Sequence, residues 1–249
     1  CGGTLISTKV VLTAAHCLDY ELSSVQVLLN IFDLSGNENV AERIDAEDWE
    51  PHENFQVRTT SVQNDIGLIY LEEPSRTVSP VEVDLNGRPD AEDTVTIMGF
   101  GATEDEYSPK KMRDVTVDVY SFADCRNWYS FIKNDLTFCA YEDFSGKGAC
   151  SGDSGGPAII SGDGPDVQVG IVSFGASNCE IGLTAFTRVS GYESWLKERV
   201  CVGDSSPDWC NDEEEPSMKP SVKPSMKPST KPSTKPSMKP SMKPSMKPS

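Results

Sequence analysis

Histidine is scarce in this sequence, and closely spaced cysteine pairs are missing. The 249 residues include two histidines, His16 and His52, and no C-x-x-C pair. Zinc sites draw mainly on these two residue types, usually with two ligands a few positions apart. The sequence therefore argues against a zinc site, and we expect neither a resident metal nor another cofactor.

Long apolar runs are missing as well. No stretch approaches the roughly 20 apolar residues that a membrane-spanning helix needs. The sequence begins at Cys1, with neither a methionine nor a secretory leader. We therefore expect no membrane span, and we expect a chain truncated at its front, from which a leader has been lost.

Basic residues are few outside the last part of the chain. The whole chain has 22 Lys and Arg against 39 Asp and Glu, a net charge of −17. Residues 216–249 hold eight of the lysines and no acids, so the preceding body has 14 basic and 39 acidic residues, a net charge of −25. Nucleic-acid binding needs a basic surface, so we expect no nucleic-acid partner. Acidity of this kind favours solubility or cationic partners.

Short apolar runs separated by Gly, Asn and Pro favour an all-β body. Residues 112–120 alternate, with three valines on one side, and this pattern predicts a half-buried strand. Helices are predicted at 121–129 and at 191–200, where apolar residues share one face. The other predicted strands contain residues 10–12, 25–32, 66–71, 95–100 and 167–174.

A four-residue repeat, PSxK with Met, Val or Thr as its third residue, fills residues 216–249. Proline at every fourth position removes backbone donors and blocks helix formation. We expect a disordered cationic tail. It is interpreted either as a solvated spacer, or as a tether to an anionic surface or polymer, or as a stalk modified at its serines and threonines.

The chain has eight cysteines, an even number. Without zinc-ligand spacing, an even count indicates disulfides and an oxidising compartment. We therefore expect a secreted, extracellular protein.

Residues 148–157 read GACSGDSGGP, with four glycines in ten positions. Glycine permits sharp turns and close approach of the backbone. The segment is either a surface loop or a site where backbone N–H groups face a charge developing beside a nucleophile, Ser154. A serine is a weak nucleophile unless a base, usually histidine, takes its proton.

Two histidines and one aspartate are candidate partners of Ser154. His16 follows small apolar residues in LTAAHC, whereas His52 lies in WEPHENF, which is typical of a loop. Asp65 begins an apolar run, NDIGLIYL, where a carboxylate is costly unless it is paired. Taken singly, each has a plainer interpretation: a core histidine, a turn or cap aspartate, and a glycine-rich loop.

Together these segments occur in the order His, Asp, Ser, and here the sequence resembles the chymotrypsin-like (trypsin-like) serine peptidases over about residues 1–200. Phe100 and Phe174 stand where the family often has tryptophan. The matching motifs are TAAHC at 13–17, NDIGLIYL at 64–71, GFG at 99–101, CSGDSGGP at 150–157 and SFG at 173–175.

The resemblance implies an all-β fold of two six-stranded antiparallel Greek-key barrels, the first incomplete at its N-terminus. Barrel one would span about 1–85, barrel two about 86–190, and a C-terminal helix 191–200. An acidic, cysteine-containing linker, 201–215, and the disordered tail, 216–249, would follow. The implied disulfides are Cys1–Cys17, Cys125–Cys139 and Cys150–Cys179, which leaves Cys201 and Cys210 to pair with each other.

The resemblance also implies a role for each candidate residue. Ser154 would be the nucleophile, His16 the general base and then acid, and Asp65 the carboxylate that orients His16. The N–H groups of Gly152 and Ser154 would form the oxyanion hole. The implied partners are protein or peptide substrates and protein inhibitors.

Specificity would be set around Gly148, at the position of the S1 pocket floor. Trypsin-like members have an aspartate there, so we expect cleavage after medium or large uncharged residues, as in chymotrypsin or elastase. Thr184, in LTAFTRV, would narrow the pocket. Because the segment 179–186 is about two residues short, the alternative is that Glu180 points into the pocket and favours basic residues. The other implied substrate-binding residues are Ser173, Phe174 and Gly175, which match the family's strand that pairs with the substrate backbone. Ser173 also matches the family's serine beside the buried aspartate.

Activation in this family depends on a new N-terminal amino group, which pairs with the aspartate before the catalytic serine, here Asp153. That group would lie upstream of Cys1, so we expect Asp153 to be unpaired in this chain, which is interpreted as a serine-type endopeptidase or, alternatively, as an inactive fragment of one. The alternatives are a non-catalytic binding module on a peptidase fold and a structural wall protein. At 33–42, an acid-rich segment is interpreted as a solvated loop or, alternatively, as a calcium site.

Overall fold

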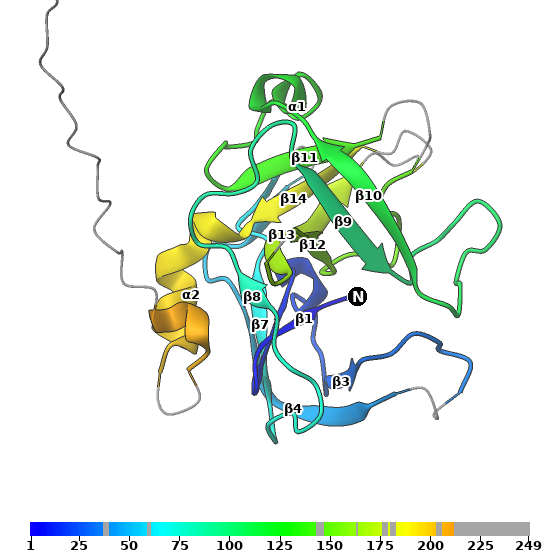
Figure 1. Cartoon of the computed structure of the whole chain (residues 1–249), viewed down its shortest axis with the longest axis vertical. Helices are drawn as coiled ribbons and strands as arrows, with labels where there is room; N and C mark the ends of the chain where they lie inside the picture. Colours follow the sequence, from blue (N-terminus) through cyan, green and yellow to red (C-terminus); the bar gives the residue numbers. More distant parts are fainter. Residues whose placement is uncertain are drawn as a thin grey trace, which may run out of the picture. The chain divides into compact units, whose positions relative to one another are not determined.

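The computed structural model describes residues 1–36, 40–58, 61–142, 147–162, 164–175, 179, 183–202 and 206–211 (Figure 1). The predicted tail at 216–249 and Glu180 lie outside the described residues, as do parts of the acidic segment 33–42 and of the linker 201–215.

The first part of the chain forms a five-stranded antiparallel sheet with the order β1-β2-β7-β4-β3. Both faces of this sheet are buried, because Val11 and Ile69 pack in one apolar cluster while Leu12 and Leu68 pack in another. Burial on both faces explains why the central strands are almost continuously apolar. The strands are β1 (Thr4–Ser7), β2 (Val10–Thr13), β3 (Gln26–Leu29), β4 (Glu42–Pro51) and β7 (Gly67–Leu71).

The second part forms a closed six-stranded barrel, since β12 pairs with both β13 and β9. A short strand, β8 (Glu82–Val83), adds to it in parallel with β13. The barrel strands are β9 (Thr94–Gly99), β10 (Arg113–Val119), β11 (Thr137–Tyr141), β12 (Pro157–Ile160), β13 (Val167–Gly175) and β14 (Thr184–Arg188). The fold is therefore mostly β, with one closed barrel and one half-barrel sheet, as expected for a chymotrypsin-like architecture.

Strand β10 agrees with the alternation predicted at 112–120. Val117 and Val119 are buried inside the barrel, whereas Thr116 and Asp118 are exposed. Their neighbours in the barrel core include Val95 on β9 and Phe186 on β14. Period-two burial is what a strand with one solvated face requires.

Both predicted helices are present. Helix α1 (Phe122–Trp128) begins after Ser121, whose hydroxyl accepts the N–H of Asp124. Helix α2 (Glu193–Val200) follows a 3-10 turn, η4 (Val189–Tyr192). Among the described residues, neither helix is long and apolar enough to cross a bilayer.

Two further 3-10 turns are η1 (Ala15–Cys17) and η5 (Asp208–Asn211). The strands β5 (Gln56–Arg58) and β6 (Ser61–Gln63) form a separate hairpin.

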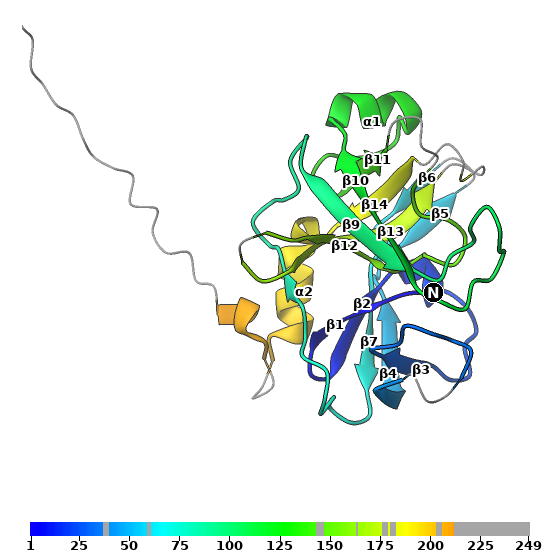
Figure 2. The ribbon, with the colours of Figure 1, turned by 45° about the vertical axis from the view of Figure 1, so that its right-hand side comes forward.

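Helix α2 lies beside the junction of the two sheets (Figures 1 and 2). Its Trp195 and Leu196 belong to an apolar cluster that also contains Ile6 of β1, Leu68 of β7 and Ile171 of β13. One core thus joins the half-barrel, the closed barrel and the helix. The segments that carry His16 and Asp65 contribute Ala14 and Ile66 to this shared core.

Trp209 attaches η5 to the half-barrel. Its side chain is 4% exposed, and its indole N–H donates to the carbonyl oxygen of Ile6 at 3.0 Å. A disulfide between Cys201 and Cys210 ties the same turn to the end of α2. Residues 206–211 therefore pack against the folded body.

Candidate active site

His16 and Asp65 are brought together at the same end of two neighbouring strands, because the last residue of β2, Thr13, pairs with the first residue of β7, Gly67. His16 lies in η1, directly after β2, and Asp65 lies two residues before β7, which pairs with β2. The imidazole Nδ1 of His16 is 2.8 Å from Oδ2 of Asp65, and the His16 backbone N–H donates to Oδ1 at 2.9 Å. The carboxylate thus fixes both the ring and the backbone of His16.

Asp65 is 2% exposed, and its remaining hydrogen bonds come from the second barrel. The hydroxyl of Ser173 on β13 donates to Oδ2 at 2.5 Å, and that of Thr187 on β14 donates to the Asp65 carbonyl at 2.7 Å. A buried carboxylate needs such donors, because an unpaired charge inside a protein is strongly unfavourable. With Asp65 ionised, His16 carries its proton on Nδ1, which leaves Nε2 free to accept a proton.

The loop that carries Ser154 has the backbone conformation that its glycines allow. Gly152 and Gly155 have φ values of 109° and 80°, in the left-handed region where side chains are strained. The N–H of Gly155 donates to the carbonyl of Val172 on β13 at 2.9 Å. Two contacts bring this loop beside η1: the Ser154 carbonyl accepts the N–H of Gly2 at 2.7 Å and lies 3.7 Å from Sγ of Cys17, the neighbour of His16.

Asp153 is held by backbone groups. Its carboxylate oxygens accept the N–H of Gly101 at 2.8 Å and that of Cys150 at 2.9 Å. A Cβ atom on Gly99 or Gly101 would lie within 2.2 Å of these oxygens, so the GFG segment must keep its glycines. Within the described part of the chain, no Lys, Arg or His forms an ion pair with Asp153.

The residues predicted to line the specificity pocket lie on adjoining segments. Thr184 is opposite Gly175 in the β13–β14 pairing, and its hydroxyl accepts the N–H of Ala149, next to Gly148, at 3.2 Å. The Phe174 ring packs against Tyr129 and Phe131, with ring centroids 5.0 and 5.5 Å away. The hydroxyl of Ser173 is bonded to Asp65, and the predicted substrate-binding role of its backbone stays a prediction.

The acid-rich segment 33–42 has both its end carboxylates engaged by protein groups. Asp33 accepts the N–H of Ser35, and Glu42 accepts hydrogen bonds from Ser75, Arg76 and Thr77. These bonds, with the Thr77 hydroxyl the largest cause, lower the pKa of Glu42 to about 2. Because residues 37–39 lie outside the described residues, the calcium site stays a prediction.

Four disulfides join the predicted pairs, three of which the family resemblance implies and the fourth of which joins the two remaining cysteines. They are Cys1–Cys17, Cys125–Cys139, Cys150–Cys179 and Cys201–Cys210. The first holds residues 1–3 beside His16, and the third holds the Ser154 loop. Such a set fits an oxidising compartment.

Two neighbours of Asp65 were not identified from the sequence. Thr187 lies in the apolar run LTAFTRV. A hydroxyl group on a buried strand needs a hydrogen-bond partner, and this need was the sequence signal that could have identified Thr187. Asn64 adopts a left-handed backbone, with φ of 53°, immediately before Asp65. Its side chain bonds with distant residues, which sequence spacing does not reveal.

The comparisons with known proteins agree with this geometry. A family model described as trypsin matches residues 1–196. The chain belongs to the trypsin family. It is therefore a trypsin-like serine endopeptidase by class, a hydrolase that acts on protein substrates.

Several trypsin-family relatives match most of the chain. A chymotrypsin of Phaedon cochleariae is 34% identical over 209 residues, which cover 79% of this chain and 71% of the relative. A brachyurin of Leptuca pugilator is 36% identical over 210 residues, with 81% and 88% covered. Trypsin-1 of Astacus astacus is 33% identical over 207 residues, with 79% and 86% covered.

Proposed function

We propose that Ser154, His16 and Asp65 form the catalytic triad of a secreted serine endopeptidase. The observation that carries the proposal is the buried Asp65 carboxylate, which accepts both the ring and the backbone N–H of His16. A buried carboxylate that fixes the histidine tautomer with its proton on Nδ1 leaves Nε2 able to accept a proton. This arrangement is suited to general-base catalysis.

In the proposed reaction, Oγ of Ser154 attacks the carbonyl carbon of the scissile peptide while Nε2 of His16 takes the hydroxyl proton. The tetrahedral intermediate collapses as its C–N bond breaks, and His16 returns the proton to the leaving amine. Water then attacks the acyl-enzyme, again with His16 as base, and releases the acid and free Ser154. Asp65 stays ionised and stabilises the imidazolium.

The oxyanion formed in each step would be bound by the backbone N–H groups of Gly152 and Ser154. The left-handed φ of Gly152 is the feature that supports this role, because a glycine there orients its peptide freely. Donors placed where charge develops are commonly worth about 3 kcal/mol each.

Covalent labelling tests the triad directly. A serine-reactive phosphonate is expected to label the wild-type chain at Ser154, and to fail with Ser154→Ala and His16→Ala. Labelling of His16→Ala at the wild-type rate would contradict the proposed base. A folded wild-type chain that resists labelling even when a short peptide with a free, apolar N-terminus is added would favour the non-catalytic binding module.

We also propose that Asp153 pairs with an amino group from a segment upstream of Cys1. Support comes from its lack of a cation within the described residues and from a neighbouring cleft of about 920 Å³. The lining of this cleft comes from both barrels and includes Gly2, Leu29, Met98, Gly99 and Gly152. In the labelling experiment, a short peptide with a free, apolar N-terminus is expected to raise the rate, and Asp153→Asn to remove the increase.

The specificity pocket is proposed to accept medium or large uncharged side chains. Gly148 provides no negative charge at the proposed floor. With peptides that differ only at P1, kcat/KM for Phe or Leu is expected to exceed that for Arg by about tenfold or more. An Ala substrate is the matched control for pocket size. Dominant cleavage after Arg would contradict the proposal and point to Glu180.

The repeat at 216–249 is proposed to bind an anionic surface or polymer. Its eight lysines and absent acids contrast with the body's net charge of −25, and clustered lysines bind anions in a salt-dependent way. A chain ending at residue 215 is expected to lose retention on an anionic matrix while keeping its labelling rate. Equal retention of both chains would leave the spacer interpretation.

A further inference from the structure

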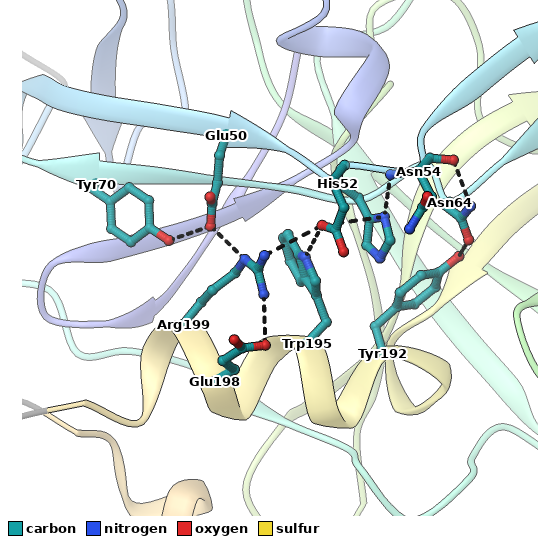
Figure 3. Close-up of polar contacts among 10 residues, drawn as sticks. Glu50, His52, Asn54, Asn64, Tyr70, Tyr192, Trp195, Glu198 and Arg199 are labelled. Atoms are coloured by element: carbon teal, nitrogen blue, oxygen red, sulfur yellow. Dashed lines mark hydrogen bonds and ion pairs between the residues drawn. The ribbon is translucent and has the colours of Figure 1, made fainter.

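His52 is enclosed by aromatic side chains (Figure 3). The residue follows β4 directly, and its side chain is 10% exposed. Its ring stacks on Trp195, with centroids 5.1 Å apart and planes 30° apart, and meets the edge of Tyr192 at 5.4 Å. The second histidine of the chain therefore packs against η4 and α2, and it has no part in the proposed reaction.

The ring of His52 accepts a hydrogen bond. The backbone N–H of Asn54 donates to Nδ1 at 3.1 Å, so Nδ1 carries no proton and the neutral ring has its proton on Nε2. Protonation of Nδ1 would place two N–H groups against each other. The bond thus requires the neutral form of His52.

The charged groups around His52 are largely committed to other partners. Glu53 lies 3.8 Å from Nδ1, but its carboxylate accepts the Trp195 indole N–H at 2.9 Å and a guanidinium N–H of Arg199 at 3.4 Å. Glu50 accepts Nε of Arg199 at 2.9 Å and the hydroxyl of Tyr70 at 2.7 Å (Figure 3). Burial, the largest cause, lowers the pKa of His52 below its ordinary 6.5; Arg199 lowers it further, while Glu53 and Glu50 raise it.

The turn that begins at His52 is connected to Asp65. The carbonyl of Asn54 accepts the amide N–H of Asn64 at 2.7 Å, and the hydroxyl of Tyr192 donates to the amide oxygen of Asn64 at 3.2 Å. Both ends of the Asn64 amide are therefore held, one by the His52 turn and one by η4 (Figure 3). These bonds fix a residue with a left-handed backbone that is the direct neighbour of the proposed catalytic carboxylate.

We propose that neutral His52 is a positioning residue for catalysis. The Phe55 N–H closes the turn at 52–55 on the His52 carbonyl at 2.8 Å, and Nδ1 of His52 fixes the Asn54 peptide within that turn. The Asn54 carbonyl in turn holds Asn64 and thereby the carboxylate of Asp65 against His16. The proposal rests on the proposed triad, because it concerns the geometry of Asp65. Protonation of His52 would break the hydrogen bond to Nδ1 and loosen Asn64. Activity would then depend on a second histidine that does not contact the substrate.

Two substitutions of His52 distinguish the contribution of its hydrogen-bond acceptor, Nδ1, from that of its aromatic ring. His52→Asn keeps an acceptor near the position of Nδ1 and cannot be protonated, whereas His52→Phe keeps an aromatic ring and has no acceptor. His52→Phe is expected to lower kcat by about tenfold with little change in KM, because misplaced catalytic groups cost rate rather than uniform binding. His52→Asn is expected to retain most of the wild-type kcat. The control is Asn54→Ala, since Asn54 uses its main chain in the bonds described here.

The pH dependence distinguishes positioning from packing. For wild type, the acid limb of kcat/KM is expected to fall more steeply than a single protonation allows, because protonation of either histidine removes activity. With His52→Asn the limb should become shallower, because this variant has no ring at position 52 to protonate. A single-proton limb in wild type, or a loss with His52→Asn equal to that with His52→Phe, would overturn the proposal.

An NMR measurement tests the proposed role of His52 without measuring enzyme activity. In folded Ser154→Ala, the two histidines give two sets of NMR ring signals, which His16→Ala assigns. The signal of His52 is expected to titrate below pH 6.5, and the downfield Nδ1 proton of His16, bonded to Asp65, should weaken in His52→Phe and persist in His52→Asn. If that proton is the same in all three chains, His52 only packs, whatever the assays of the triad show.

Discussion

Replacing Asp65 by asparagine is expected to lower kcat by about 10⁴-fold with a much smaller change in KM, as the matching substitution does in chymotrypsin-type enzymes. All three side-chain or backbone groups that contact the Asp65 carboxylate are donors, from His16 and Ser173. An amide offers one acceptor oxygen and a donor NH₂. With the oxygen kept at Oδ1 for the His16 backbone N–H, the NH₂ replaces Oδ2, where it meets both the His16 ring N–H and the Ser173 hydroxyl. His16 then relieves the clash by taking the tautomer with its proton on Nε2, which cannot deprotonate Ser154.

The matched control for Asp65→Asn is Asp84→Asn. Asp84 is also buried, at 7% exposure, and its carboxylate also accepts two backbone N–H groups, those of Asn86 and Arg88. It lies outside the proposed triad, so kcat should stay within about threefold of wild type once folding is verified by thermal unfolding. Similar losses in both variants would mean that Asp65 supports the fold rather than the reaction.

Arg188 is expected to be among the most costly side chains to remove from the fold. Its guanidinium is buried and donates to the carbonyl oxygens of Asn134, Gly87 and Pro89 at 2.8–3.1 Å. It also lies over the Phe138 ring, 5.3 Å from the centroid. Arg188→Met would leave three carbonyl groups without their donor, and each such group costs about 1–3 kcal/mol.

The expected change for Arg188→Met is a loss of about 3–5 kcal/mol in the free energy of unfolding, and a fall in Tm of roughly 10 °C. Chemical denaturation and thermal unfolding measure these quantities. Arg126→Met is the control, because Arg126 is exposed and its long contact with Ser130, 3.5 Å, is weak. A Tm for Arg188→Met equal to that of the control would show that water replaces the guanidinium.

Strands with regular patterns could be predicted from the sequence, and β4 could not. Strand β10 has one apolar and one polar face, so its alternation is unbroken. Strand β4 carries Ile44, Ala46 and Trp49 toward the sheet's apolar cluster, but a bulge between Ala46 and Asp48 shifts the alternation, and charged residues fill the positions between. A bulge adds one residue and reverses the face of all that follow, so the pattern disappears.

The candidate site was predictable where a residue's chemistry is encoded next to it. Ser154 lies within a glycine-rich loop, and Asp65 begins an apolar strand, so both have local signals. The surroundings of His52 had no such signal, because Tyr192 and Trp195 lie some 140 positions later in the chain. The sequence indicated a loop at His52, and only the fold brings the aromatic rings of α2 and η4 onto it.

If residues beyond Asn211 tether the protein, Trp209 would carry part of any force that pulls on the chain. A pull on the chain after η5 is transmitted first to the Cys201–Cys210 loop, which is covalent, and to the indole that is buried against Ile6. The force would therefore be shared between two attachments, one to β1 and one to the end of α2. Helix α2 therefore bears only part of such a load while Trp209 stays in its site, because the Ile6 contact on β1 carries the rest.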